Sequence, residues 1–314
     1  MAFISVIIPL FNKERFIKKT LLSVLNQTFS DFEILLINDG STDSSVDIVN
    51  SFDDERITLY STENKGVSHA RNYGVSKSTS DLIALLDADD LWEFNHLENL
   101  HNLYTSFPKC GLYATAYYKR FFNGKKMNTH FNGVSKDHFG VIDDYFLAST
   151  KDSIAWTSAV MIPKKTILEV GGFDNEMRSG QDTDLWIRIA LKESVAFSAL
   201  ATANKIILSP QYHLSYSSNR VDRMKLFENF KDVDSSNTSF KKYMDLNRFS
   251  VAIERKAAGD FNSYRQLKKE IDLTNLNRIQ RVLLNTPSLF IGLLKQFQNT
   301  LLRYNIYLSP FKKQ

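Results

Sequence analysis

The chain has 314 residues, of which 43% are hydrophobic and 24% are charged, which is typical of a globular protein with a sizeable core. Its single cysteine, Cys110, excludes an internal disulfide and fits a reducing, cytoplasmic compartment. No apolar run of about 18 residues occurs, so no membrane-spanning helix is expected. The N-terminal residues lack the basic segment and the cleavage site of a secretory signal.

The net charge of +4 is unevenly distributed. Residues 222–314 carry 17 Lys and Arg against 9 Asp and Glu, whereas residues 1–221 carry 22 against 26. Residues 273–314 hold six basic residues, no acidic residue and many apolar ones. Such a tail suits an anionic membrane surface or an acidic partner; alternatively, it packs on its own domain or on a second subunit. No nucleic-acid partner is expected.

From the N-terminus, short apolar runs alternate with segments of helical spacing. Strands are predicted at residues 3–10, 32–38, 57–60 and 82–86, and helices at residues 15–26, 45–52 and 68–74. Because the strands show no alternation with polar residues, they are typical of a parallel sheet that helices cover on both faces. We therefore predict an α/β fold with a Rossmann-like, mostly parallel central sheet flanked by helices.

Polar clusters follow three of these strands, at Phe11-Asn12, at residues 39–43 and at residues 87–90. In doubly wound folds ligands bind beyond the carboxyl ends of the strands, so we expect the three clusters to converge on one site. Neither a GxGxxG nor a GxxxxGK[ST] motif occurs, which excludes the dinucleotide fingerprint and the P-loop.

The sequence Asp87-Ala88-Asp89-Asp90 places three carboxylates directly after an apolar strand. Carboxylates at the edge of a core lose solvation and repel one another unless a cation neutralises them. Oxygen ligands suit Mg²⁺ or Mn²⁺, and such ions in turn suit a diphosphate. The alternative is a helix that begins at Leu91, with Asp90 as its cap and the other two carboxylates solvated.

Beyond residue 110 the pattern is weaker. Strands are predicted at residues 112–122, 154–162 and 203–208, helices within 137–147 and at 163–170 and 185–191, a hairpin at Asn123-Gly124 and a tight turn at residues 171–174. After about residue 220 the predicted elements are helices, at residues 222–246, 248–258, 260–285 and 288–304. We therefore predict one domain at residues 1–220 and a basic helical C-terminal extension at residues 221–314.

Six motifs follow one another along the chain: SVIIPLFN, INDGSTD, ENKGVSHARNYG, LLDADDLW, GGFD and QDTDLWIRI. Together they closely resemble the family 2 glycosyltransferases, which have the GT-A fold, and the resemblance covers roughly residues 3–218. It implies transfer of a sugar from a nucleotide-diphosphate donor, with a UDP-sugar favoured, to a hydroxyl. It also implies inversion at the anomeric carbon and a divalent metal, Mn²⁺ or Mg²⁺.

The resemblance also implies residues that bind the donor. Asp39 would accept the N3–H of a uracil ring, although Asp-Gly-Ser is also a good turn sequence. The remaining donor contacts implied are Pro9, Phe11 and Asn12 around the base, then Asn64, Lys65 and Arg71, and Asp87 with Ala88 near the ribose. In the alternative interpretation, Lys65 and Arg71 are solvated surface charges.

Asp87-Ala88-Asp89 matches the DXD-type motif of the family. The resemblance assigns Asp89 to direct metal coordination and Asp87 to the ribose and metal side. His213 follows the last predicted strand, near the point where many members have a histidine that contacts the metal or the diphosphate. A lone histidine is also often structural, so both interpretations of His213 stay open.

An inverting transfer needs one carboxylate that removes the proton of the acceptor hydroxyl. Asp182 is the predicted base, at the start of the helix at residues 185–191, and Asp184 is the alternative base or a helix cap. Family members usually have Glu-Asp here, whereas this chain has Gln181-Asp182. Trp186 either stacks on a sugar ring or packs in the core.

We therefore predict a cytoplasmic hexosyl- or N-acetylhexosaminyltransferase in cell-surface polysaccharide synthesis, with a glycan or lipid-linked acceptor. Residues 273–314 would hold it peripherally at the inner face of the cell membrane or take part in a homo-oligomer. One rival hypothesis is a nucleotidyltransferase acting on a sugar phosphate, although residues 9–14 lack its Gly- and Lys/Arg-rich loop. Another is a nucleotide-sugar binding module without catalysis, which Gln181 alone supports. No motif in the sequence indicates which sugar is transferred or which linkage is formed.

Overall fold

The computed structural model describes residues 2–121, 124–207, 223–233 and 237–303. The chain forms two compact units, which are described separately. The first consists of Met1–Thr129, Val134–Tyr145 and Ile154–Ile207, and the second of His130–Gly133, Phe146–Ser153 and Leu208–Gln314. The division of the sequence at residue 220 stays a prediction, because residues 208–222 lie outside the described residues.

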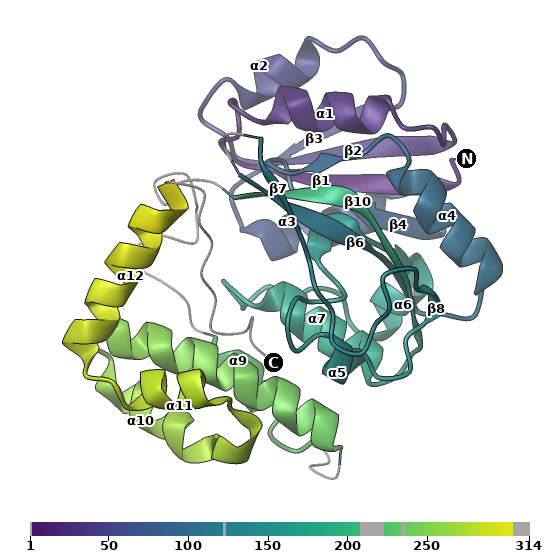
Figure 1. Cartoon of the computed structure of the whole chain (residues 1–314). Helices are drawn as coiled ribbons and strands as arrows, with labels where there is room; N and C mark the ends of the chain where they lie inside the picture. The colour runs from purple at the N-terminus through teal and green to yellow at the C-terminus, as the bar shows by residue number, and fades with distance from the viewer. Residues whose placement is uncertain (1, 122–123, 208–222, 234–236, 304–314) are drawn as a thin grey trace. The chain divides into compact units, whose positions relative to one another are not determined.

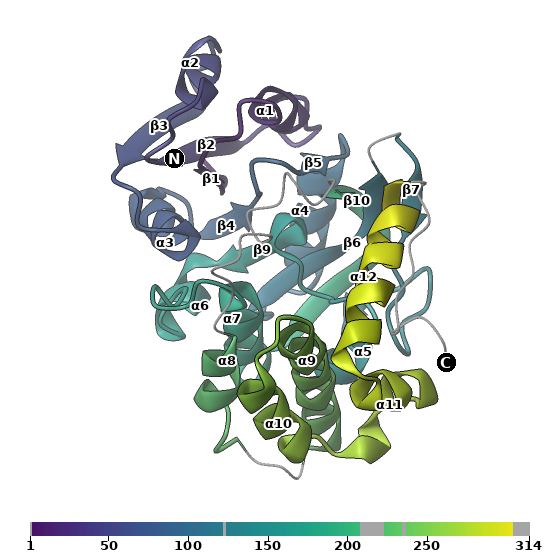
Figure 2. The same ribbon diagram turned by 90° about the vertical axis from the view of Figure 1, so that its left-hand side faces the viewer.

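The first unit is built on one sheet, in which ten strands pair within the described residues (Figure 2). Along its main path the order is β3-β2-β1-β4-β9-β6-β10-β5. The first four strands in this order run parallel, and they are β3 (Ile57–Thr62), β2 (Phe32–Asp39), β1 (Ile4–Leu10) and β4 (Leu82–Leu85). Their carboxyl ends therefore meet at one edge, where the predicted polar clusters stand.

Helices cover both faces of this parallel part. α1 (Ile17–Leu25) and α2 (Ser45–Asn50) lie on one face, and α3 (Val67–Lys77) lies on the other (Figure 1). Gly74 lets α3 approach the sheet closely, because a Cβ at this position would stand 2.5 Å from Cγ2 of Ile7. Strands β1 and β2 are buried on both faces, as their unbroken apolar sequences predict.

The sheet is mixed beyond β4. β9 (Val160–Pro163) runs antiparallel to both β4 and β6 (Leu112–Phe121), while β10 (Val195–Ile207) runs parallel to β6. The path ends at β5 (Leu91–Trp92), antiparallel to β10. Two short strands extend the sheet: β7 (Lys126–Asn128) pairs with β6, and β8 (Phe139–Val141) pairs with β10. Helices in this part of the chain include α4 (His96–Ser106), α6 (Lys164–Glu169) and α7 (Gln181–Ala190). The predicted α/β class with a sheet flanked by helices is confirmed. The expected parallel pairing holds for the first four strands and for β6 with β10, whereas the other described pairs are antiparallel.

Three element predictions between residues 137 and 207 are wrong. Residues 137–147 form β8 and a short helix, α5 (Tyr145–Ala148), instead of starting one longer helix. The strand predicted at 154–162 is only β9, preceded by a 3-10 turn, η1 (Thr157–Ala159). These loop residues are as buried as a strand, so an apolar run did not distinguish them from one. The last strand is also longer than predicted, because it already begins at Val195.

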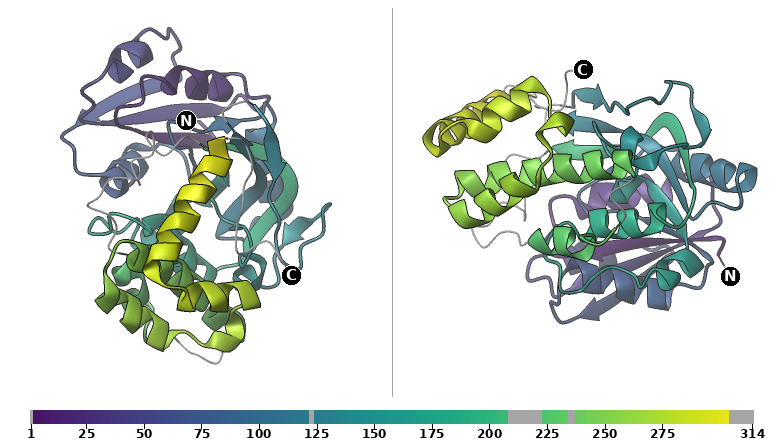
Figure 3. Two further views of the ribbon diagram at one scale, coloured as in Figure 1. Left: turned by 60° about the vertical axis from the view of Figure 1, so that its left-hand side comes forward. Right: turned by 90° about the horizontal axis from the view of Figure 1, so that it is seen from below.

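The second unit is helical, and Figure 3 shows its helices in green to yellow from two sides. Its described elements are α8 (Met224–Asn229), α9 (Thr238–Ala257), α10 (Phe261–Glu270), the 3-10 turn η4 (Leu273–Asn275), α11 (Arg278–Asn285) and α12 (Ser288–Arg303). The predicted break at residue 247 is absent, since α9 runs through it, and the helix predicted at 260–285 is two helices. None of the described helices is both long enough and apolar enough to span a bilayer.

Candidate active site

The loop after β1 is tied to the loop after β2. Asn12 adopts a left-handed backbone with φ 52°, and its Oδ1 accepts a hydrogen bond of 2.8 Å from the backbone N–H of Thr42. The backbone N–H of Asn12 donates to Oγ of Ser41 at 3.1 Å. Asn12 is exposed, whereas Pro9 and Phe11 are half-buried. Two of the predicted polar clusters are therefore adjacent in space.

Asp39, at the end of β2, holds the loop that leads into α3. Its two carboxylate oxygens accept the backbone N–H groups of Lys65 and Gly66 at 2.8 and 2.9 Å, and the residue is 4% exposed. Asn64 and Lys65 are exposed in this loop. The sequence did not predict this contact, which brings three of the predicted donor-binding residues together.

Arg71 and Asp87 form an ion pair between α3 and the end of β4. Nη2 of Arg71 donates to Oδ1 of Asp87 at 2.6 Å, and the side chains are 4% and 30% exposed. The guanidinium also lies 5.1 Å from the ring centroid of Phe173. Its Nε and Nη1 are buried and have no hydrogen-bond partner among the described residues. Arg71 is therefore not a solvated surface charge, and it has two donors left for an acceptor.

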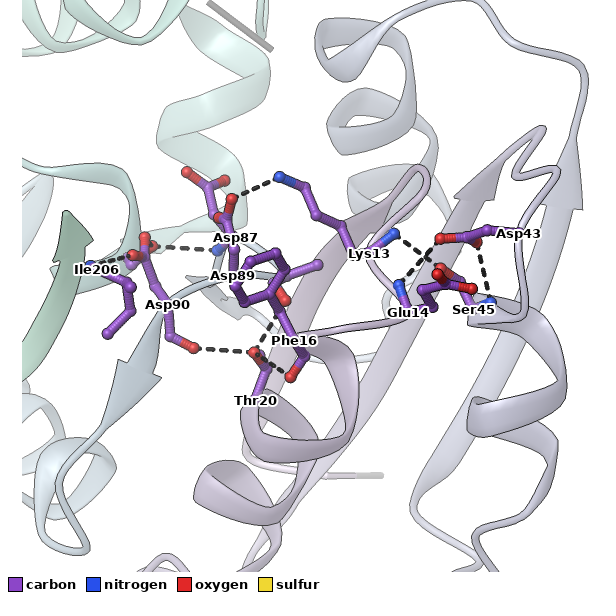
Figure 4. A network of polar contacts seen from close by, with 12 residues as sticks. Lys13, Glu14, Phe16, Thr20, Asp43, Ser45, Asp87, Asp89, Asp90 and Ile206 are labelled. Atoms are coloured by element: carbon purple, nitrogen blue, oxygen red, sulfur yellow. Dashed lines mark hydrogen bonds and ion pairs between the residues drawn. The ribbon is translucent and has the colours of Figure 1, made fainter. Parts of the chain in front are cut away.

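Lys13 and Asp89 form the second ion pair at this edge. Nζ of Lys13 lies 2.5 Å from Oδ2 of Asp89, with the side chains 13% and 22% exposed, and Figure 4 shows this contact. Within the described part of the chain, Lys13 is the only hydrogen-bond partner of the Asp89 side chain. Each carboxylate of the Asp87-Ala88-Asp89 motif thus faces a cation of the same chain.

Asp90 is buried and does not cap a helix. Ser158 donates to its Oδ2 at 2.7 Å. The backbone N–H of Ile206 donates to its Oδ1 at 3.0 Å, a contact that Figure 4 shows. Burial raises the pKa of the Asp90 carboxyl well above its ordinary value, and repulsion from Asp89 and Asp87 adds to the rise. The alternative of a helix beginning at Leu91 is wrong, because β5 follows and α4 begins only at His96.

Asp182 lies in the first turn of α7 and is half-buried. Its Oδ1 accepts the backbone N–H of Thr183 at 2.7 Å. Asp184 is different, since it is 1% exposed and accepts two hydrogen bonds, of 2.8 and 2.6 Å, from the guanidinium of Arg188. A base must be reachable by its substrate, so Asp182 fits that role and Asp184 does not.

The turn at residues 171–174 links α7 to α3. Arg188 donates to the backbone carbonyls of Val170 and Gly172. On the other side, Asn72 of α3 accepts the backbone N–H of Phe173 at 2.9 Å and donates to its carbonyl at 2.7 Å. Because Arg71 is the neighbour of Asn72, this turn connects the helix that carries Asp182 to the helix that pairs with Asp87.

Gln181 and Trp186 face inward on α7. Trp186 is 2% exposed and packs edge-on against Phe173, with ring centroids 6.2 Å apart. It therefore packs in the core. Gln181 is buried, and its Oε1 has no partner among the described residues. The amide thus occupies a buried position where the resemblance leads us to expect a glutamate.

The chemistry of the acidic motif fits a divalent metal. Mg²⁺ is commonly held by one or two carboxylates together with substrate phosphates, and Asp87 and Asp89 supply two partly exposed carboxylates at one loop. No group of three or more metal-binding side chains occurs among the described residues. His213, the third predicted ligand, lies outside the described residues. The rest of the coordination would therefore come from the donor and water.

The family model for glycosyl transferase family 2 matches residues 5–167, which is just over half of the chain. This chain belongs to glycosyl transferase family 2. Within the family, a protein of Rickettsia bellii, named as an uncharacterized glycosyltransferase, is 32% identical over 194 residues, which cover 60% of this chain and 26% of the relative. Another, from Haemophilus influenzae, is 41% identical over 105 residues, which cover 32% of this chain and 42% of the relative. The chain thus spans less than half the length of these relatives.

Solved structures share the fold of this family 2 chain. The structure of residues 1–349 of S. aureus TarS, in complex with UDP-GlcNAc, has a TM-score of 0.68 at 15% identity, over 98% of this chain and 93% of that one. A second S. aureus TarS structure has a TM-score of 0.65 at 15% identity, over 95% of this chain and 54% of that one. The predicted GT-A fold is confirmed by these similarities.

Two residues at the site were missed from the sequence. Lys13 had a positional signal, since it is the third residue after β1, at the edge where the strands end. Ser158 had none, although its Oγ accepts the backbone N–H of Asp87 at 3.1 Å and donates to Asp90. A serine within an apolar run does not indicate a contact to residues about 70 positions earlier.

Proposed function

We propose that this chain is an inverting glycosyltransferase that transfers a sugar from a UDP-sugar to a hydroxyl of a glycan or lipid-linked acceptor in cell-surface polysaccharide synthesis. Its proposed compartment is the cytoplasm. The observation that carries the proposal is the Asp87–Arg71 pair at the carboxyl edge of the sheet. A partly exposed carboxylate and a buried guanidinium, two nitrogens of which have no hydrogen-bond partner among the described residues, suit a metal-bound, negatively charged nucleotide-sugar. Family membership and the UDP-GlcNAc named for the TarS structure favour a UDP-sugar.

The donor would be held by residues from four loops. Pro9, Phe11 and Asn12 would line the base pocket, and Asp39 would accept the uracil N3–H through the lone pairs that Lys65 and Gly66 leave free. Arg71 would donate from Nε and Nη1, which no described residue accepts from, to a phosphate or to the base. The remaining proposed contacts are Asn64, Lys65, Asp87 and Ala88 toward the donor, and Asp87, Asp89 and His213 toward the metal.

A divalent ion, Mn²⁺ or Mg²⁺, would supply positive charge to the departing nucleoside diphosphate. Asp182 would remove the proton of the acceptor hydroxyl as the oxygen attacks the anomeric carbon in line with the leaving group. A single displacement of this kind inverts the anomeric configuration and needs no covalent intermediate. Asp184, Arg188 and the 171–174 turn would position Asp182.

The test is cleavage of UDP-GlcNAc, with released UDP measured with and without Mn²⁺. We expect the wild type to cleave the donor in the presence of metal even without an acceptor. Asp182→Asn should lower the rate by about 10²–10⁴-fold, because general base catalysis contributes that much. Its affinity for UDP, measured by calorimetry, should be unchanged.

Asp53→Asn removes an exposed carboxylate of the same unit and is the matched control, with full activity expected. Full activity of Asp182→Asn would reject the assigned base. Metal-dependent UDP binding without cleavage of UDP-, GDP- or dTDP-sugars would favour the binding module. Formation of a sugar nucleotide from a sugar phosphate and UTP would favour nucleotidyl transfer.

The second unit carries an exposed apolar surface that suits a lipid-linked acceptor. On α12, Leu289, Phe290, Leu293, Leu294 and Phe297 are between 47% and 72% exposed, whereas Ile291 is 2% exposed. Ile279 and Val282 of α11 are also exposed, beside exposed Arg278 and Arg281. Apolar side chains flanked by basic ones, with no acidic residue from 273 onward, suit an anionic lipid surface. We therefore propose peripheral membrane contact through α11 and α12.

A further inference from the structure

Lys13 forms an ion pair with Asp89, which is one of the two carboxylates, Asp87 and Asp89, that are proposed to bind the metal. Its Nζ lies 2.5 Å from Oδ2 of Asp89, and both side chains are largely shielded from solvent. An ammonium group held this closely on Oδ2 opposes a divalent cation at the same carboxylate, because the two cations repel each other. Moving Lys13 away from Asp89 would therefore strengthen metal binding by the motif of Asp87 and Asp89.

The backbone of Lys13 is fixed, so a move away from Asp89 needs only a change in its side-chain rotamer. Its N–H donates to Oγ of the fully buried Ser45 at 2.8 Å, and the next N–H, of Glu14, donates to Asp43 at 3.0 Å (Figure 4). The four-carbon side chain can swing about this anchor. Arg71 is not comparable, since its side chain is 4% exposed and lies against Phe173.

We propose that Lys13 is the internal counter-ion of Asp89 and couples metal binding to diphosphate binding. In the free protein Lys13 neutralises Asp89, and it transfers to the donor's phosphates when the metal takes that carboxylate. A metal alone must displace Lys13 without giving it a new anionic partner, so it binds weakly. A diphosphate supplies that partner, so metal and nucleotide strengthen each other's binding. The proposal rests on the metal and donor site of the proposed function.

The test variant is Lys13→Met, which keeps most of the unbranched apolar stem of the side chain and removes its charge. Mn²⁺ affinity without nucleotide is measured from the electron paramagnetic resonance signal of free Mn²⁺. UDP affinity at saturating Mn²⁺ is measured by calorimetry. We expect Mn²⁺ alone to bind about tenfold more tightly to the variant and UDP about tenfold more weakly, each change corresponding to about 1.4 kcal/mol. A general loss of structure would weaken both affinities.

Two controls accompany this variant. Lys18→Met removes an exposed charge of α1 and should change neither affinity. Lys13→Arg keeps the charge and should stay close to the wild type in both. If Lys13→Met does not fold, the shorter Lys13→Gln replaces it, with the same two shifts expected.

The outcomes separate this proposal from the proposed function. A wild type that binds Mn²⁺ and UDP with Lys13→Met unchanged in its Mn²⁺ affinity would overturn the role of Lys13 alone. A variant in which both affinities fall would also overturn it. A wild type that binds neither Mn²⁺ nor UDP would overturn the proposed donor site itself.

Discussion

Three neighbouring carboxylates at the end of β4 are held by three different sets of partners. Asp87 pairs with the buried Arg71, and Asp89 pairs with Lys13. Among the described residues, no cation contacts the side chain of Asp90. Ser158 and the backbone of Ile206 satisfy its oxygens, and its pKa is raised. Two of these carboxylates remain partly exposed for a ligand, and the third fixes the loop. Adjacent residues of one type thus have separate tasks because their surroundings differ.

His96 gives a pH dependence that is separate from the site. It is fully buried, shares a hydrogen bond of 2.7 Å between Nδ1 and Oγ1 of Thr202, and lies against Trp92. Burial lowers the pKa of His96 from 6.5 to about 3. Between these values the unfolded chain takes up a proton that the folded chain does not, so stability falls as the pH falls below 6.5.

We expect this histidine to contribute a loss of about 2 kcal/mol in unfolding free energy between pH 7 and pH 5. The asparagine of His96→Asn keeps a polar atom near Thr202 but does not titrate in this range. The unfolding free energy of this variant should therefore fall by about 2 kcal/mol less than that of the wild type between pH 7 and pH 5. The measurement is urea unfolding of both proteins at the two pH values. Equal losses in wild type and variant would mean that His96 is protonated in the folded protein.

At the scale of elements, the 171–174 turn sets the position of α7 against α3. Gly172 has φ +70°, and a Cβ there would stand 2.8 Å from Oδ1 of Asn72, the atom that accepts the Phe173 N–H. Gly171 has φ +89° but nothing within 4 Å of its hypothetical Cβ. A substitution at either glycine therefore strains the backbone. Only a substitution at Gly172 also brings a Cβ against Asn72.

Gly171→Ala is expected to cost roughly 1–2 kcal/mol of stability, because only the left-handed backbone is strained. Gly172→Ala should cost more and should also lower the rate of donor cleavage, since displacing Asn72 moves the turn on which α7 rests. Urea unfolding and UDP-GlcNAc cleavage on both variants measure these effects. Identical behaviour of the two variants would show that Asn72 does not set the turn.

At the scale of the whole molecule, the chain combines a sheet-based unit with a helical one whose last two helices expose large apolar side chains. Phe290 and Phe297 are 55% and 57% exposed on α12. Fully burying one such side chain contributes about 1.5–3 kcal/mol, so partial insertion of two contributes enough to decide between bound and free protein. The basic residues nearby make anionic lipid the favoured surface.

We expect the wild type to float with vesicles that contain phosphatidylglycerol and much less with phosphatidylcholine vesicles. Phe290→Ser combined with Phe297→Ser should lower the partition coefficient of the protein between water and these vesicles by roughly tenfold or more. The control, Phe94→Ser with Leu168→Ser, changes apolar side chains of similar exposure in the first unit and should bind as the wild type does. Equal flotation of the α12 variant would reject the lipid surface. A dimer that dissociates in that variant would instead assign the face to a second copy.

Much of the candidate site could be read from the chain because strand ends are a local property. Apolar runs followed by Asn12, Asp39 and Asp87 indicate parallel strands and their polar edge wherever the rest of the chain lies. The same reasoning was wrong at residues 154–159, because a loop and a 3-10 turn there are as buried as a strand.

The sequence by itself determined the α/β class, the order of the first strands and the residues at their ends, because hydrophobic periodicity and motif order are written along the chain. Only the tertiary structure decided which charges meet. Lys13 and Asp89 are 76 residues apart, and Asn72 and Phe173 are 101 apart. Such contacts depend on the order of strands in the sheet and on the depth at which each helix packs, and neither is encoded in any local pattern.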